Sequence, residues 1–180
     1  MVQNAILAIA AARAFGVSIE EAARGLASAS LTKARLQVRE IRGVQFLDDS
    51  YNANPDSTKA ALRTLAELDT DGRRIAVLGQ MGELGGETER GHAEVGHCAA
   101  ELRIDHLITV GDIAATISDA AQAVGLENVA NASDHAEAAE LLSATAAPGD
   151  LVLVKGSRAA RMERVLEEFR SAQSAIRNPV

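Results

Sequence analysis

Short apolar strands alternate with helical segments through most of this chain, and that alternation limits the possible folds more than any other feature. Predicted strands cover residues 74–78, 106–110, 128–130 and 151–154, and predicted helices cover residues 87–102, 112–124, 134–144 and 158–170. Short strands separated by helices of about 10 to 15 residues require right-handed crossovers and a mostly parallel sheet with helices on both faces. The sequence therefore predicts a doubly wound α/β fold.

An antiparallel edge pair is expected before this alternation begins. Residues 36–41 and 44–48 are two short strand-like stretches, and Arg42 and Gly43 between them suit a tight turn. The expected fold class is thus α/β, doubly wound and mostly parallel, with one antiparallel pair at the edge of the sheet.

A helical hairpin is expected at the start of the chain. Residues 2–15 are rich in alanine and helical in pattern, and Ser18 with Glu21 has the capping-box spacing that begins a second helix. A hairpin this small cannot bury both of its faces alone, which favours a remnant of a preceding domain. We therefore expect residues 1–33 to be a helical remnant with its linker, and residues 34–180 to be the sheet domain.

The charge, the aromatic content and the cysteine content limit which partners the protein can bind and in which cellular compartment it is expected. The formal charge is -7, with one Tyr, three Phe and no Trp, which argues against phosphate contacts along a nucleic acid and against base stacking. Cys98 is the only cysteine, so no intrachain disulfide can form, and no apolar run is long enough to span a membrane. A cytoplasmic protein that binds no nucleic acid is expected.

The carboxyl ends of the strands are where a ligand is expected, because the strand-to-helix loops of an open parallel sheet gather there. Four loops qualify: residues 49–56, 79–86, 111–112 and 155–158. The first is rich in carboxylates and amides, and it also supplies Asn54 as a helix N-cap and Pro55 as the first helical residue. Turn and cap chemistry alone explains part of this loop, so its composition does not by itself establish a binding site.

Several familiar motifs are absent or incomplete. The glycines of residues 79–86 do not have the spacing of a dinucleotide-binding loop, and no phosphate-binding G-x-x-x-x-G-K-[ST] occurs in the chain. His92 and His97 are five positions apart on a predicted helix and cannot easily share a metal ion. We therefore expect no metal site in this chain.

Three separated segments resemble, in the same order, the carboxyl-terminal domain of the Mur ligase family. They are residues 48–57 (DDSYNANPDS), residues 77–85 (VLGQMGELG) and residues 154–158 (VKGSR). The first helix, beginning VQNA, and residues 31–36 resemble the end of the family's central ATP-binding domain and its linker. The resemblance covers nearly the whole chain and is closest to the members that add a D-alanyl-D-alanine dipeptide.

The resemblance implies an ATP-dependent reaction that forms an amide bond. In such a ligase a substrate carboxylate is phosphorylated to an acyl phosphate, which an amine then attacks. For this type the amine is D-alanyl-D-alanine and the acceptor is UDP-N-acetylmuramoyl-tripeptide, a cytoplasmic precursor of peptidoglycan. ATP and Mg²⁺ would act in the full-length enzyme, with the metal ligands in a missing central domain. This chain would then supply no catalytic residue and would be inactive without the central and N-terminal domains.

Nucleotide contacts are implied at three positions. Asn4, Arg35 and Asp49 match residues with which the family reaches the nucleotide. Their chemistry fits, because a carboxylate accepts from ribose hydroxyls and an arginine keeps its charge beside a phosphate.

Substrate contacts are implied on two loops. Lys155, Ser157 and Arg158 match the loop that holds the incoming amino acid or dipeptide, and Asn52 and Asn54 are expected along the same cleft. Two cations and a hydroxyl at the start of a predicted helix suit a carboxylate.

Gln80 departs from the family, since members often carry an acid at that position. Three alternatives remain open from the sequence. The first is that the chain belongs to a sister ligase that adds another amino acid. The second is a ligand-binding module without chemistry, and the third is an interaction domain that docks through its hairpin.

Overall fold

The computed structural model describes residues 2–28 and 36–176, and the chain divides into two compact units, Met1–Thr32 and Lys33–Val180. In the first unit, α1 (Val2–Ala14) and α2 (Ile19–Ala27) form the expected helical hairpin. The Ser18 hydroxyl accepts from the Glu21 N–H and the Glu21 carboxylate accepts from the Ser18 N–H, so the predicted capping box is confirmed. That this unit is the remnant of another domain stays a prediction.

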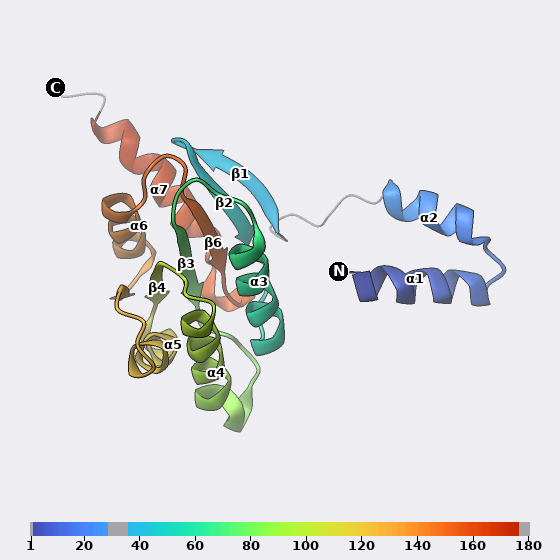
Figure 1. Ribbon diagram of the computed structural model, residues 1–180, viewed down its shortest axis with the longest axis horizontal. Helices are drawn as coiled ribbons and strands as arrows, with labels where there is room; N and C mark the ends of the chain where they lie inside the picture. The colour runs from blue at the N-terminus through green and yellow to red at the C-terminus, as the bar shows by residue number, and fades with distance from the viewer. Residues whose placement is uncertain (1, 29–35, 177–180) are drawn as a thin grey trace. The chain divides into compact units, whose positions relative to one another are not determined.

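The second unit is built on one six-stranded sheet (Figure 1). Its strands are β1 (Gln37–Ile41), β2 (Val44–Asp49), β3 (Arg74–Gly79), β4 (His106–Val110), β5 (Val129–Ala132) and β6 (Leu151–Lys155). They lie in the order β1-β2-β6-β3-β4-β5, and every neighbouring pair is parallel except β1 with β2. The predicted fold class, including its antiparallel edge pair, is confirmed.

Helices cover both faces of the sheet, as a doubly wound fold requires (Figure 1). One face carries α3 (Pro55–Glu67), α4 (Thr88–Glu101) and α5 (Asp112–Ala123), and the other carries α6 (His135–Thr145) and α7 (Glu163–Ile176). Side chains of a strand alternate between the two cores: in β3, Ala76 and Leu78 face the first set of helices, whereas Ile75 and Val77 face the second. None of the described helices is long and apolar enough to cross a membrane.

The position of β6 determines where a site can form. This last strand lies between β2 and β3, with Lys155 paired in register with Asp49 on one side and with Leu78 on the other. Because the three strands are parallel, the loops that follow them leave the sheet at the same edge. Loops that are far apart in sequence therefore meet there.

The last helix begins later than the sequence pattern predicts. Residues 158–160 form a single 3-10 turn, Arg161 adopts a left-handed backbone with φ of 48°, and α7 begins at Glu163. The turn directs the fully buried Met162 back against Gly156, where an added Cβ would lie 2.5 Å from the Met162 Cγ. The prediction of a helix over residues 158–170 is wrong at its start, and so is the expected α-helix N-terminus at Arg158.

Candidate functional site

The loop after β2 ends in the helix cap that the sequence predicts. The Asn54 side-chain oxygen accepts from the Ser57 N–H at 2.8 Å, and the Ser57 hydroxyl accepts from the Asn54 N–H at 3.1 Å. Pro55 is the first residue of α3 and loses no hydrogen bond there. The cap holds the end of this loop in one conformation and occupies the Asn54 amide oxygen.

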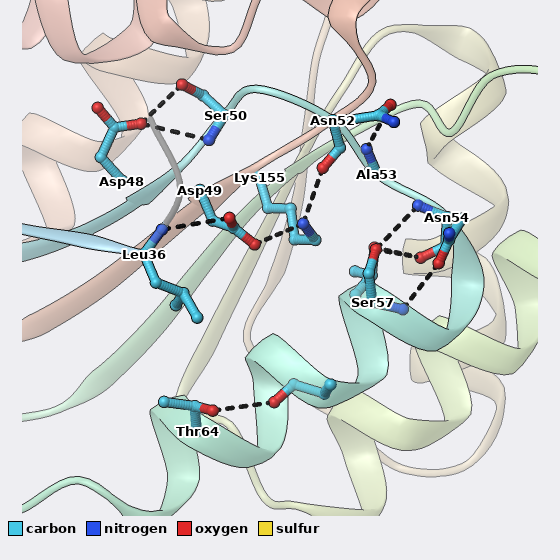
Figure 2. Close-up of polar contacts among 12 residues, drawn as sticks. Leu36, Asp48, Asp49, Ser50, Asn52, Ala53, Asn54, Ser57, Thr64 and Lys155 are labelled. Carbon is cyan, nitrogen blue, oxygen red and sulfur yellow. Dashed lines mark hydrogen bonds and ion pairs between the residues drawn. The ribbon is translucent and has the colours of Figure 1, made fainter. Parts of the chain in front are cut away.

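The two carboxylates at the end of β2 have different surroundings, because successive side chains of a strand point to opposite faces. Asp48 is buried, pairs with Arg39 at 3.1 Å and accepts from the Ser50 hydroxyl at 2.6 Å. Asp49 points to the other face, toward the end of β6 (Figure 2). Asp48 therefore holds the loop in shape, whereas Asp49 faces the end of β6 at the edge of the sheet.

Asp49 is bonded to Lys155 across the two neighbouring strands. The Lys155 ammonium donates to the Asp49 Oδ2 at 2.5 Å and to the carbonyl oxygen of Asn52 at 2.8 Å (Figure 2). The Asp49 Oδ1 accepts from the Leu36 N–H at 3.2 Å. Only 3% of the Lys155 side chain and 14% of the Asp49 side chain are exposed. The predicted nucleotide residue and the predicted substrate residue are thus in direct contact.

A buried histidine holds the glycine-rich loop after β3. The Met81 N–H donates to the His92 Nε2 at 2.9 Å, and the His92 Nδ1 lies 2.6 Å from the carbonyl oxygen of Thr88. Since Nε2 accepts, Nδ1 must carry the proton, and the ring is neutral in this arrangement. The Ser157 N–H donates to the carbonyl oxygen of Gln80 at 2.9 Å, which joins this loop to the one after β6.

The loop after β6 presents a hydroxyl and a cation. The Ser157 hydroxyl oxygen is buried and has no hydrogen-bond partner among the described residues. The Arg158 guanidinium donates to Glu163 at 2.9 Å, yet 68% of the Arg158 side chain remains exposed. The His135 Nε2 lies 2.7 Å from the carbonyl oxygen of Ala160 and holds the 3-10 turn of residues 158–160 in place. The loop offers two groups that can donate to an anion.

Two adjoining hollows open where these loops meet. The larger has a volume of about 560 Å³ and is lined by residues 51–54, 82–84 and 157–159. The smaller, of about 200 Å³, is lined by Asp49, Asn52, Asn54, Ser57 and Lys155. Asn52 and Asn54 line both, so one loop separates them. Glu83 and Arg158 both line the larger hollow, and the presence of both charges suits a small zwitterion.

The structure brings six of the eight predicted site residues to this edge of the sheet: Asp49, Asn52, Asn54, Lys155, Ser157 and Arg158. Asn4 lies exposed on α1 in the first unit. Arg35 lies outside the described residues. The contacts of all eight with a ligand remain predictions.

Sequence reasoning also missed parts of the site. The loop of residues 111–112, which was expected to take part, lines neither hollow. Tyr51, Glu83 and Ala159 line the larger hollow without having been singled out. The first two lie inside the motif segments, so their loops could be found from the sequence but their individual positions could not. His92, whose sequence spacing from His97 argued only against a metal ion, holds the loop instead.

The donors at the site do not suggest a bound metal ion. Within residues 2–28 and 36–176, no group of three or more His, Cys, Asp and Glu side chains could hold one. Asp49 already shares its carboxylate with an ammonium group and a backbone N–H. Its remaining lone pairs suit hydroxyl donors such as those of a ribose.

Comparison with known proteins gives the same family that the motif segments predict. The family described as "Mur ligase, glutamate ligase domain" matches residues 34–158, more than half of the chain. The UDP-N-acetylmuramoyl-tripeptide–D-alanyl-D-alanine ligase of Bacillus subtilis (strain 168) is 34% identical over 170 residues, covering 93% of this chain and 37% of that protein.

Solved structures of similar proteins share the fold. A crystal structure of MurF from Acinetobacter baumannii superposes with a TM-score of 0.80 at 34% identity, covering 94% of this chain and 37% of that one. MurF ligase from Thermotoga maritima in complex with ADP gives a TM-score of 0.75 at 29% identity, covering 93% and 37%. The chain spans little more than a third of the length of these relatives. Its motif loops, its fold and the family match together assign this chain to the Mur ligase family.

Proposed function

We propose that this chain is the carboxyl-terminal part of an ATP-dependent ligase that adds D-alanyl-D-alanine to UDP-N-acetylmuramoyl-tripeptide through an acyl phosphate. The family match and the Bacillus subtilis relative support the reaction and its substrates. The ADP in the Thermotoga maritima structure supports a nucleotide partner. The protein would act in the cytoplasm, with the preceding domains supplying the phosphate-binding loop and the Mg²⁺ ligands.

One observation carries the dipeptide assignment. The wall of the larger hollow combines a buried Ser157 hydroxyl that lacks a partner with an exposed Arg158 guanidinium. An unpaired buried donor is costly, and a carboxylate would satisfy it while pairing with the guanidinium. Glu83 also lines this hollow and adds a negative charge to it. A hollow of about 560 Å³ is large enough for two alanine residues and the water around them.

The nucleotide assignment rests on the smaller hollow. Asp49 has lone pairs left for ribose hydroxyls, and Asn4 and Arg35 are the other two proposed nucleotide contacts. Bound nucleotide would thus lie beside bound dipeptide, separated by the loop that carries Asn52 and Asn54.

This chain's own residues would position the amine rather than change its bonds. Anchoring the dipeptide carboxylate at Ser157 and Arg158 leaves its amino group directed away from the anchor, toward the acyl phosphate held by the preceding domain. Holding two reactants in attack geometry removes much of the entropy cost of their meeting. Closure of this domain over the phosphate would also exclude the water that hydrolyses an acyl phosphate.

The proposal is tested in the complete ligase that contains this chain. The coding sequence before residue 1 is expected to include an in-frame phosphate-binding loop. Release of phosphate from ATP should require both D-alanyl-D-alanine and the UDP-tripeptide, and mass spectrometry should detect the dipeptide adduct. Activity with a single amino acid in place of the dipeptide would identify a sister ligase and refute the dipeptide assignment.

Individual contacts are tested by paired variants. Ser157→Ala and Arg158→Gln should raise the KM for D-alanyl-D-alanine roughly tenfold or more, the effect of losing a hydrogen bond to a charged group, and leave the KM for ATP nearly unchanged. Asp49→Asn should do the reverse. Arg90→Gln is a matched control for Arg158, because Arg90 is 73% exposed, is ion-paired to Glu87 and lines neither hollow. If the KM for the dipeptide is unchanged in both Ser157→Ala and Arg158→Gln, neither residue contacts the dipeptide and the assignment is refuted.

A further inference from the structure

Lys155 differs from the other predicted ligand contacts because two of its three ammonium donors are already bonded within the protein. Its side chain is 3% exposed, and its ammonium bonds the Asp49 carboxylate and the Asn52 carbonyl oxygen at the same time (Figure 2). A buried ammonium group is expensive unless it is paired and hydrogen-bonded, so these two contacts are strongly held. Little of the charge is left for a ligand.

The two acceptors of Lys155 belong to different parts of the site. Asp49 lines only the smaller of the two hollows. Asn52 lines both hollows and belongs to the loop that separates them. The Lys155 Nζ therefore holds both the Asp49 carboxylate and the loop that carries Asn52. Asn52 is further constrained because its own side-chain oxygen accepts from the Ala53 N–H at 2.9 Å.

We infer that Lys155 is a positioning residue that joins the nucleotide side of the site to the dipeptide side, and that it acts through Asp49 and the Asn52 carbonyl rather than by touching either ligand. This inference rests on the proposed function for the identity of the two ligands. The ammonium group holds Asp49 in one rotamer beside the smaller hollow. It also fixes the loop of residues 51–54, which lines the larger hollow. Loss of Lys155 should therefore weaken binding on both sides.

A double-mutant cycle in the complete ligase tests how Lys155 acts. Lys155→Met keeps the aliphatic stem and removes the charge, and it should raise the KM for ATP and the KM for D-alanyl-D-alanine about tenfold each, with a smaller change in kcat. In an Asp49→Asn background, Lys155→Met should raise the KM for ATP less than about twofold further, because the carboxylate through which Lys155 acts is gone. The KM for the dipeptide should still rise, because the Asn52 contact is still lost.

Three kinetic results would overturn the inference. Effects on the KM for ATP that multiply in the double variant would mean that Lys155 contacts the nucleotide itself. A Lys155→Met enzyme with both KM values unchanged would remove any role in binding. The same KM changes in Lys59→Met would mean that the Lys155 effect is general destabilisation. Lys59 on α3 pairs with Glu94 on α4 at 2.9 Å, and neither residue lines a hollow.

A spectroscopic measurement on the 180-residue chain tests the geometry without relying on the proposed function. The sequence has only three lysines, so ¹⁵N-labelled lysine gives a simple side-chain spectrum. The Lys155 ammonium should exchange its protons with water much more slowly than that of Lys59, whose side chain is 20% exposed, and Asp49→Asn should reduce the difference. Equally fast exchange at Lys155 and Lys59 would refute the inference. If the complete ligase proves to use a different amine, the proposed dipeptide fails, and the same cycle with that amine decides the role of Lys155.

Discussion

Gly156→Ala should destabilise the sheet domain through a single steric contact beneath the site. An alanine Cβ at this position would lie 2.5 Å from the Met162 Cγ, 3.2 Å from the Ala160 Cβ and 3.3 Å from the Gly79 Cα. The Met162 Cγ lies in the middle of a fully buried side chain, so it cannot swing away freely. Overpacking of this kind costs about 2 kcal/mol, which for a domain of this size lowers the Tm by roughly 6 °C.

Gly82→Ala is the matched control, because Gly82 lies in the same site and its added Cβ would meet the nearest atoms of Ser157 at ordinary distances of 3.6 and 3.7 Å. Thermal unfolding followed by circular dichroism should show the large loss only for Gly156→Ala. In the Gly156→Ala background, Met162→Ala should cost at least about 1 kcal/mol less than in the wild type, because the new methyl group occupies the space that Met162 vacates. Equal Tm values for the two glycine variants, or strictly additive costs in the double variant, would refute this reasoning.

Three further outcomes follow from the structure. Asn54→Ala should lower the free energy of unfolding by about 1 kcal/mol, whereas Asn54→Asp should retain most of it, as measured by urea titration, because only the alanine lacks the capping oxygen. Burial by itself would raise the pKa of Asp150, but hydrogen bonds from Arg73 and from the Ala147 amide lower it below its usual value. The resulting stability is present above about pH 4 and is lost as pH falls further, so Asp150→Asn should flatten the acid limb of a plot of unfolding free energy against pH. Burial and then the charge of Arg73 lower the pKa of His106, so the stability from its neutral form is present above about pH 6.5 and declines below it, and His106→Gln should reduce that decline in the same titration.

Local features of the fold could be predicted because each depends on neighbouring residues. The strand-helix alternation, the turn at Arg42 and Gly43, and the Asn54 cap are all specified within a few positions of the chain. The start of α7 could not be placed in this way. The turn that delays it depends on the contact of Met162 with Gly79 and Gly156, and the first of these glycines belongs to a distant strand.

The site could be located from the sequence more readily than it could be interpreted. Parallel strands imply that their loops gather at one edge, so residues near 50 and 156 were expected to meet, and they do. Which residue touches which depends on the insertion of β6 between β2 and β3. No local pattern specifies that register, and the bond between Asp49 and Lys155 joins residues 106 positions apart.

The central place of β6 in the sheet also has a consequence for synthesis of the protein. A ribosome releases β2, β3, β4 and β5 before β6 emerges, so the edges of β2 and β3 that pair with β6 in the finished sheet have no partner until residues 151–155 have been made. Unpaired strand edges attract other chains, and contacts between distant residues form slowly. A nascent chain that stalls before residue 151 would therefore carry two unpaired strand edges and would lack the part of the pocket that residues 155–159 line, so ligand capture would report that β6 has been inserted.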